Sequence, residues 1–127
     1  MQTTHLADAS ALALLARSDV AARLVPLLVG GGAATCGITD LEVLRAFDQT
    51  ERAAVRAERS MFSRVPIDDA VLDRAMEVQA GLAAPVRIPA LIVAAAAETA
   101  GLVLLHDDDV YDAIAAVTGQ PTERAVS

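Results

Sequence analysis

The sequence predicts an α/β fold with three layers, in which a central, mainly parallel sheet of four or five strands carries helices on both faces. Short strand-like segments alternate with longer helical segments, and this alternation favours right-handed crossovers between parallel strands. The segment "LVLLH" at residues 102–106 is a continuous apolar run, which is typical of a central parallel strand. We expect residues 1–127 to form a single domain.

The first quarter of the chain predicts one strand and two helices. "THLA" at residues 4–7 is a short first strand, and residues 10–16 form a short helix. Ser18 or Asp19 is expected to cap a second helix, because a small polar side chain accepts a hydrogen bond from the first backbone N–H groups. This helix ends near Val29, where "GGG" stops it.

The second quarter predicts a strand, two helices and an edge strand. "AATCGI" at residues 33–38 is the second strand, and "TDLEVLRAFD" opens a helix at Thr39. An arginine-rich helix covers roughly residues 51–61. "RVPI" at residues 64–67 is strand-like, and its proline favours an edge of the sheet because it has no N–H to donate.

The C-terminal half predicts three helices around the central strand. Asp68 is expected to cap a helix over residues 69–84. The helix at residues 90–100 is apolar nearly all round, so we expect it to be well buried. Residues 109–119 form the last helix, and residues 123–126 add a final edge strand.

The composition limits the possible functions. Apolar residues make up 54% of the chain and aromatic residues 2%, so the core has to be built from small aliphatic side chains. A net charge of −7 gives no long-range attraction to nucleic acid, which would require a local basic patch or a bridging cation. All ten basic residues are arginines, whose planar fork suits phosphate, although a compositional bias of the genome is the simpler explanation.

Several kinds of protein fit the sequence poorly. "GGG" lacks the Lys-Ser/Thr of a phosphate-binding loop, and a receiver domain needs a lysine. His5 and His106 have no cysteine pattern that suggests zinc, and Ser10 lacks a histidine base. The single cysteine, Cys36, fits a reducing cytoplasm. No signal peptide is recognisable, and residues 88–97 are too short to span a bilayer, so we expect a cytoplasmic protein without membrane contact.

Acidic residues follow two of the predicted strands. Asp8 follows the first strand, and Asp107, Asp108 and Asp109 follow the fourth. Because the carboxyl ends of parallel strands meet at one edge of a sheet, these acids converge if the two strands are neighbours. Glu42 is a third carboxylate position that this topology could add. Clustered carboxylates repel one another unless a cation intervenes, and oxygen ligands suit Mg²⁺ or Mn²⁺.

Each acid also has a purely structural interpretation. Asp8 could cap the helix that follows the first strand, and Thr39 with Glu42 has the spacing of a capping box. In the aspartate run, one residue is expected to cap the next helix and one to be solvated, so only one faces a site. Asp68 and Asp69 are most simply helix caps.

Four segments together resemble the PIN-domain ribonucleases, specifically the VapC-type toxins of bacterial toxin–antitoxin pairs. They are "LADASAL" (6–12), "ATCGITDLEVL" (34–44), "IPALIVAAAAETAGLVLLH" (88–106) and "DAIAAVTGQPTE" (112–123), in order along nearly the whole chain. The resemblance implies a Mg²⁺-dependent endoribonuclease that cleaves RNA, often tRNA or rRNA. It also implies a homodimer and a cognate antitoxin whose C-terminal segment binds near the active site. Arginines between residues 45 and 64 would help to frame the groove for antitoxin or RNA, unless they form only a solvated helix face.

The resemblance also assigns site residues. The family's glutamate falls on Glu42, since the alternative, Asp40, lies nearly half a turn away around the same helix. The implied catalytic and metal-binding residues are Asp8, Glu42 and Asp108, and the candidate supporting residues are Ser10, Asp107 and Asp109.

Ala90 departs from the family pattern, because it stands where the family's third acid normally lies. Val110 likewise replaces a further aspartate. The chain is then an inactivated variant, a weakly active natural homologue, or one in which Asp107 or Asp109 partly substitutes. We expect loss of most activity with the fold retained. The alternative function is a non-catalytic PIN-like module that binds antitoxin or RNA without cleaving.

Overall fold

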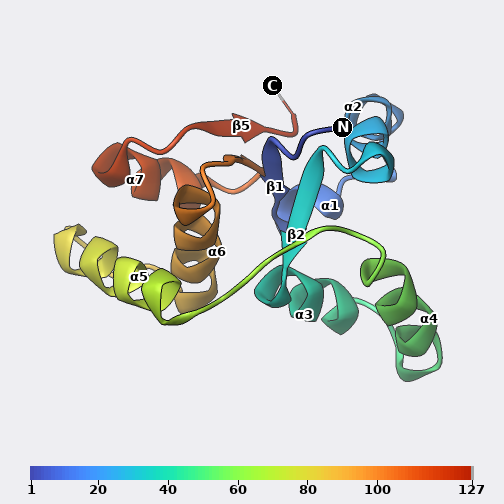
Figure 1. Ribbon diagram of the computed structural model, residues 1–127, viewed down its shortest axis with the longest axis horizontal. Helices are drawn as coiled ribbons and strands as arrows, with labels where there is room; N and C mark the ends of the chain where they lie inside the picture. The colour runs from blue at the N-terminus through green and yellow to red at the C-terminus, as the bar shows by residue number, and fades with distance from the viewer. Residues whose placement is uncertain (127) are drawn as a thin grey trace.

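The computed structural model describes residues 1–126; Ser127, the last residue of the predicted domain, lies outside the described residues. One sheet of five parallel strands runs through these residues in the order β3-β2-β1-β4-β5. Figure 1 labels β1 and β2, which lie side by side, and β5 near the C-terminus. The predicted α/β class and parallel sheet are therefore confirmed. The strands are β1 (His5–Ala7), β2 (Ala33–Cys36), β3 (Arg64–Val65), β4 (Val103–His106) and β5 (Thr122–Arg124).

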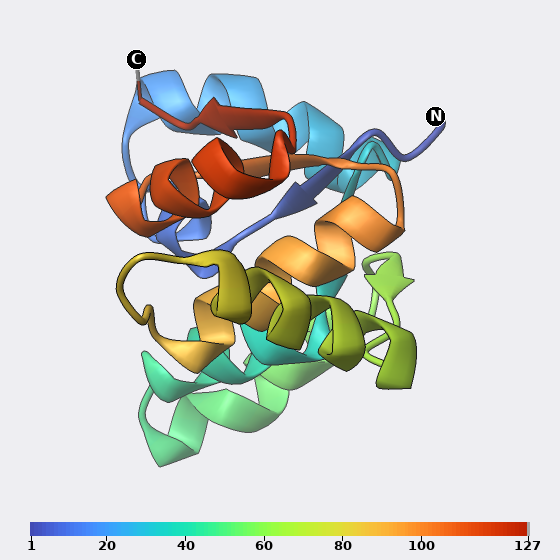
Figure 2. The same cartoon turned by 90° about the vertical axis from the view of Figure 1, so that its left-hand side faces the viewer.

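Helices cover both faces of the sheet, which gives the three predicted layers. Helices α1 and α2 pack on one face, and α5, α6 and α7 pack on the other, where α5 and α6 lie side by side (Figure 2). Within residues 1–126 no helix is long and apolar enough to cross a membrane. The helices are α1 (Ala9–Leu12), α2 (Ser18–Gly30), α3 (Gly37–Arg45), α4 (Gln49–Arg59), α5 (Asp69–Gly81), α6 (Ile88–Thr99) and α7 (Asp109–Thr118).

The two cores follow from alternation along the strands. Leu6 and Leu104 face the α5–α6–α7 layer, whereas Leu105 faces the α1–α2 layer and packs with Leu24. All four of these leucines are fully buried, which contributes roughly 1.5–3 kcal/mol each by removing apolar area from water. The consecutive alanines of α6 are also buried, so the predicted burial of this helix is confirmed.

Several helix boundaries differ from the prediction. Helix α1 ends at Leu12 rather than residue 16, because the chain continues in tight turns with i→i+3 hydrogen bonds. The predicted cap by Ser18 or Asp19 is wrong: Arg17 is the N-cap residue of α2 and makes no side-chain cap bond. Gly31, with a φ of 81°, ends α2 in the left-handed conformation that glycine adopts without strain.

Helix α3 begins at Gly37, two residues before the predicted start at Thr39. Thr39 is fully buried, and its Oγ1 lies 3.5 Å from the Sγ of Cys36. Thr39 is therefore an interior residue of the helix, and the capping-box interpretation of Glu42 is wrong. Helix α6 likewise begins at Ile88 rather than residue 90, with Pro89 in its first turn, where no N–H is needed.

The strand order places the carboxyl ends of β1 and β4 next to each other. Ala7 pairs with Leu105, and the backbone N–H of Asp8 donates to the Leu105 carbonyl at 2.9 Å. From β1 the chain builds the sheet outward through β2 and β3, and then returns to the other side of β1 with β4 and β5. The switch in strand order thus falls between β1 and β4, where α/β folds form their sites.

Candidate active site

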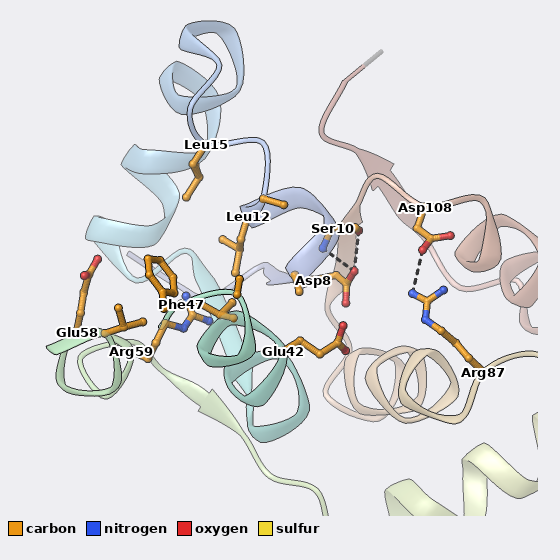
Figure 3. A pocket seen from close by; sticks show the side chains of 15 residues that line it. Asp8, Ser10, Leu12, Leu15, Glu42, Phe47, Glu58, Arg59, Arg87 and Asp108 are labelled. Carbon is orange, nitrogen blue, oxygen red and sulfur yellow. Dashed lines mark hydrogen bonds and ion pairs between the residues drawn. The ribbon is translucent and has the colours of Figure 1, made fainter. Parts of the chain in front are cut away.

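A pocket of about 810 Å³ opens at the carboxyl ends of β1 and β4 (Figure 3). Its acidic end is lined by the three predicted carboxylates, and Figure 3 shows Asp8 and Glu42 directed into the same space. The other end is lined mainly by apolar side chains, including Leu12 of α1, Leu15 in the turns after α1, and Phe47 in the segment after α3. The structure therefore brings Asp8, Glu42 and Asp108 to one pocket, together with Ser10 and Arg87.

Asp8 is buried at 1% exposure and is held by protein donors on both carboxylate oxygens. Its Oδ2 accepts from the backbone N–H of Ser10 at 3.0 Å and from the Ser10 hydroxyl at 2.6 Å. Its Oδ1 accepts from the Tyr111 hydroxyl at 2.7 Å. Burial and the Asp8 charge raise the pKa of Tyr111, so its hydroxyl stays protonated as the donor. Asp8 is thus both the N-cap of α1 and a wall of the pocket.

Ser10 connects the ends of the two central strands. Its hydroxyl donates to Asp8 and accepts from the backbone N–H of Asp107 at 2.9 Å. This bridge fixes the loop after β4 against the start of α1. Ser10 thus lies beside Asp8, in agreement with its predicted role as a supporting residue.

Glu42 lies on α3 with its carboxylate free of hydrogen bonds and ion pairs within residues 1–126. Burial raises the pKa of Glu42, and the negative charges of Asp8 and Asp108 raise it further, while Arg87 and Arg45 oppose them. Both aspartates therefore lie close enough to Glu42 to act on its charge.

Asp108 caps α7 and closes the acidic end of the pocket. Its Oδ1 accepts from the Val110 backbone N–H at 3.0 Å, and its Oδ2 pairs with Arg87 at 2.9 Å. The Val110 hydrogen bond, assisted by the Arg87 charge, lowers the pKa of Asp108, so the group is ionised over the neutral range.

The other two aspartates of the run do not line this pocket. The Asp109 side chain is 95% exposed and pairs with Arg124, and an Asp107 oxygen lies 3.9 Å from the same arginine. Of the three aspartates only Asp108 lines the pocket, as expected for one residue of the run, and the same residue provides the helix cap. The structure gives no support to a substitute carboxylate from Asp107 or Asp109.

Asp40, the alternative to Glu42, is committed to a different contact. It is 5% exposed and accepts from the Thr35 hydroxyl at 2.8 Å, from Arg59 Nε at 3.0 Å, and from Arg64. These partners lie in β2, α4 and β3, outside the acidic end of the pocket. The geometry therefore agrees with the choice of Glu42.

The position that departs from the family pattern is buried. Ala90 is 1% exposed in the first turn of α6 and belongs to the core. Residues 1–126 contain no group of three or more Asp, Glu, His or Cys side chains placed to hold a metal ion. The oxygen donors suit a hard cation chemically. As placed, however, they do not form a complete cation site, because Arg87 pairs with Asp108 and Ala90 adds no ligand.

Two residues of the site were not identified from the sequence. Tyr111 is the only tyrosine in the chain, and a lone polar aromatic within a mostly apolar helix is a weak signal for a buried hydrogen bond. Arg87 lies between two prolines in the segment before α6, and nothing in the sequence indicates that it reaches Asp108, 21 residues later.

A comparison with protein families identifies the family to which this chain belongs. Residues 6–117 match the family model described as the PIN domain. This chain belongs to the PIN-domain family. Its curated relatives are ribonucleases of the VapC type, so the resemblance stated from the sequence is confirmed.

Two of these relatives come from Mycobacterium tuberculosis. The chain is 39% identical to Ribonuclease VapC51, with 97% of this chain and 93% of the relative covered. It is 38% identical to Ribonuclease VapC21, with 100% and 97% covered. Among solved structures, the fold resembles DNA-bound VapBC from Salmonella typhimurium, with a TM-score of 0.78, 16% identity, and 98% and 99% covered. The structure of FitAB bound to IR36 DNA gives a TM-score of 0.74, 12% identity, and 96% and 95% covered.

Proposed function

We propose that this chain is an endoribonuclease of the VapC type, the toxin of a toxin–antitoxin pair. The observation that carries the proposal is the convergence of Asp8, Glu42 and Asp108 in one pocket of a PIN-domain chain. Curated relatives that cover nearly the whole chain are named ribonucleases, which supports RNA as the substrate. The RNA class, tRNA or rRNA, is a finer proposal that rests on the family resemblance.

The three carboxylates are the proposed catalytic residues. Glu42 has no protein donor among residues 1–126 and a raised pKa, so it is the carboxylate best suited to accept a proton within the pocket. Asp8 is held rigidly by Ser10 and Tyr111, which fixes the position of its charge. Mg²⁺ or Mn²⁺ remains the proposed cofactor, but the placement of these groups predicts weak binding, and with it low activity.

The proposed partners are RNA, a cognate antitoxin and a second copy of the chain. Neighbouring structures described as VapBC and as FitAB support the antitoxin, and the apolar end of the pocket offers it a hydrophobic contact surface. Exposed arginines of α3 and α4, namely Arg45, Arg52 and Arg56, provide the local positive charge that RNA binding requires in an acidic protein. The homodimer and a cytoplasmic location are proposals that rest on the resemblance.

The test is RNA cleavage by the chain and by Ala90→Asp, with Mn²⁺ or Mg²⁺ titrated. We expect weak cleavage by the chain and at least a tenfold gain for Ala90→Asp, because a fourth carboxylate strengthens cation binding. The matched control is Ala90→Asn, which has the same shape without the charge and should give no gain. Since position 90 is buried, we also expect Ala90→Asp to melt lower than the chain in metal-free buffer and to recover with Mn²⁺.

A non-catalytic PIN-like module is the second candidate function, and the Arg87–Asp108 ion pair together with Ala90 favours it. It would be supported if neither the chain nor Ala90→Asp cleaved any RNA while both bound RNA or antitoxin. Cleavage that depends on Asp8 and Glu42 would exclude it.

A further inference from the structure

Arg87 is a cation at the acidic end of the pocket. Two basic residues of the described chain line the pocket, Arg87 and Arg59. Arg59 is 7% exposed and is bound to Asp40 and Thr35 at the far end. Figure 3 shows that Arg87 instead extends its guanidinium to Asp108, and the two groups lie 2.9 Å apart. Of these two arginines, Arg87 is therefore the one whose positive charge lies at the carboxylates.

The partners of the carboxylate oxygens show which group opposes a metal ion. Both oxygens of Asp8 accept from Ser10 and Tyr111. Asp108 gives one oxygen to the Val110 N–H and the other to Arg87. The Arg87 partner is the only one of these that carries a full positive charge, and its side chain is 46% exposed, so it has room to move away.

The balance of charges in the pocket also identifies Arg87 as the group that opposes metal binding. Asp8, Glu42 and Asp108 carry three negative charges, and Arg87 also interacts electrostatically with Asp8 and Glu42. An arginine in this position relieves part of the mutual repulsion that would otherwise favour a divalent cation. Ala90 adds no further negative charge to attract one.

We propose that Arg87 serves as the built-in counter-ion of this site, so that its guanidinium and a divalent metal ion compete for Asp108. The proposal rests on the assignment of Asp8, Glu42 and Asp108 to one site in the proposed function. In this proposal Arg87 lowers the affinity of the site for a divalent metal ion, and with it the activity of the site.

The test is Mn²⁺ binding, measured by electron paramagnetic resonance on the full chain without RNA. We expect Arg87→Gln to bind Mn²⁺ at least tenfold more tightly than the chain, and Arg87→Gln/Asp108→Asn to lose this gain. The matched control is Arg124→Gln, since Arg124 pairs with Asp109 and Asp112 of the same segment outside the pocket. It should change Mn²⁺ affinity by less than about twofold, because a surface pair is screened by solvent.

The same series in the Ala90→Asp background separates this inference from the proposed function. If Ala90→Asp binds Mn²⁺ equally well with arginine or glutamine at position 87, the inference is wrong, but the metal-dependent function stands. If no variant binds Mn²⁺, both the competition and the metal dependence are wrong. Unchanged or weaker binding by Arg87→Gln, with an intact fold by circular dichroism, also overturns the inference.

Discussion

Asp8 combines a structural and a proposed chemical role in one side chain. It caps α1 through Ser10 and accepts the buried Tyr111 hydroxyl, while its charge faces Glu42 across the pocket. The sequence left these interpretations as alternatives, and the structure shows that the cap and the pocket wall are the same residue. Its two effects on stability have opposite signs, so two substitutions can separate them.

We predict that Asp8→Ala lowers the free energy of unfolding by about 2–4 kcal/mol, through the lost cap and the unpaired Tyr111 hydroxyl. Asp8→Asn should instead match or exceed the wild-type stability in metal-free buffer, by no more than about 1 kcal/mol. The amide keeps an acceptor for Ser10, the Tyr111 hydroxyl can turn to accept from it, and the repulsion with Glu42 is relieved. Urea unfolding of both variants measures this. A loss of 2 kcal/mol or more in Asp8→Asn, on the order of a lost buried hydrogen bond, would mean that the charge is needed structurally.

At the level of single residues, the sequence indicated the carboxylates and Ser10 but not the other partners of these carboxylates. Asp8 and the run Asp107–Asp109 were identifiable because acids that follow strands lie at the sheet edge in a parallel α/β fold, and the family resemblance then selected Asp108. Arg87 and Tyr111 were not, because each reaches its partner across a long stretch of chain, and no local pattern encodes such a contact.

At the level of elements, α4 is attached to the sheet by a buried ionic contact. Arg59, in the last turn of α4, donates to Asp40 on α3 and to Thr35 on β2, and it lies over the Phe62 ring. Asp40 also accepts from Arg64 on β3, whose side chain is 55% exposed. These contacts position α3, and Glu42 with it, at the edge of the pocket.

We predict that Asp40→Ala lowers the free energy of unfolding by about 3–5 kcal/mol, because it leaves the buried Arg59 charge without its partner. Arg64→Gln removes the exposed partner of the same carboxylate and should lower it by about 1 kcal/mol or less. Chemical denaturation monitored by circular dichroism gives both values. Equal decreases in the free energy of unfolding for the two variants would show that the burial of Arg59 does not determine the stability of the Asp40–Arg59–Arg64 contacts.

The element types were predictable from the sequence, whereas their ends were less so. Glycine stops such as Gly31 were recognised because a left-handed residue at a helix end favours glycine whatever its surroundings. The start of α3 was missed because tertiary contacts override local capping there: Thr39, a good cap by type, is used as a buried interior residue.

At the level of the whole molecule, the sheet order brings together segments far apart in the sequence. Asp8 follows β1, Glu42 lies on the helix after β2, and Asp108 follows β4, so the placement of β4 beside β1 unites them. The molecule places three negative charges in one pocket, and Arg87 offsets part of that charge. Both the proposed activity and its expected weakness follow from this arrangement.

The pH dependence of Glu42 tests this convergence most directly. Because the pKa of Glu42 is raised above 4.5 in the folded chain, the folded state favours its protonated form. The stability that this group contributes is therefore present below pH 4.5 and is lost as the pH rises through the raised pKa. Removing a neighbouring negative charge should lower this pKa, and removing the neighbouring positive charge should raise it.

The measurement is an NMR titration of the Glu42 side-chain carboxyl carbon in the chain, in Asp8→Asn and in Arg87→Gln. We predict a midpoint above pH 4.5 in the chain, a lower midpoint in Asp8→Asn and a higher one in Arg87→Gln. A midpoint at or below pH 4.5 that neither substitution moves would show that the carboxylates do not share one pocket.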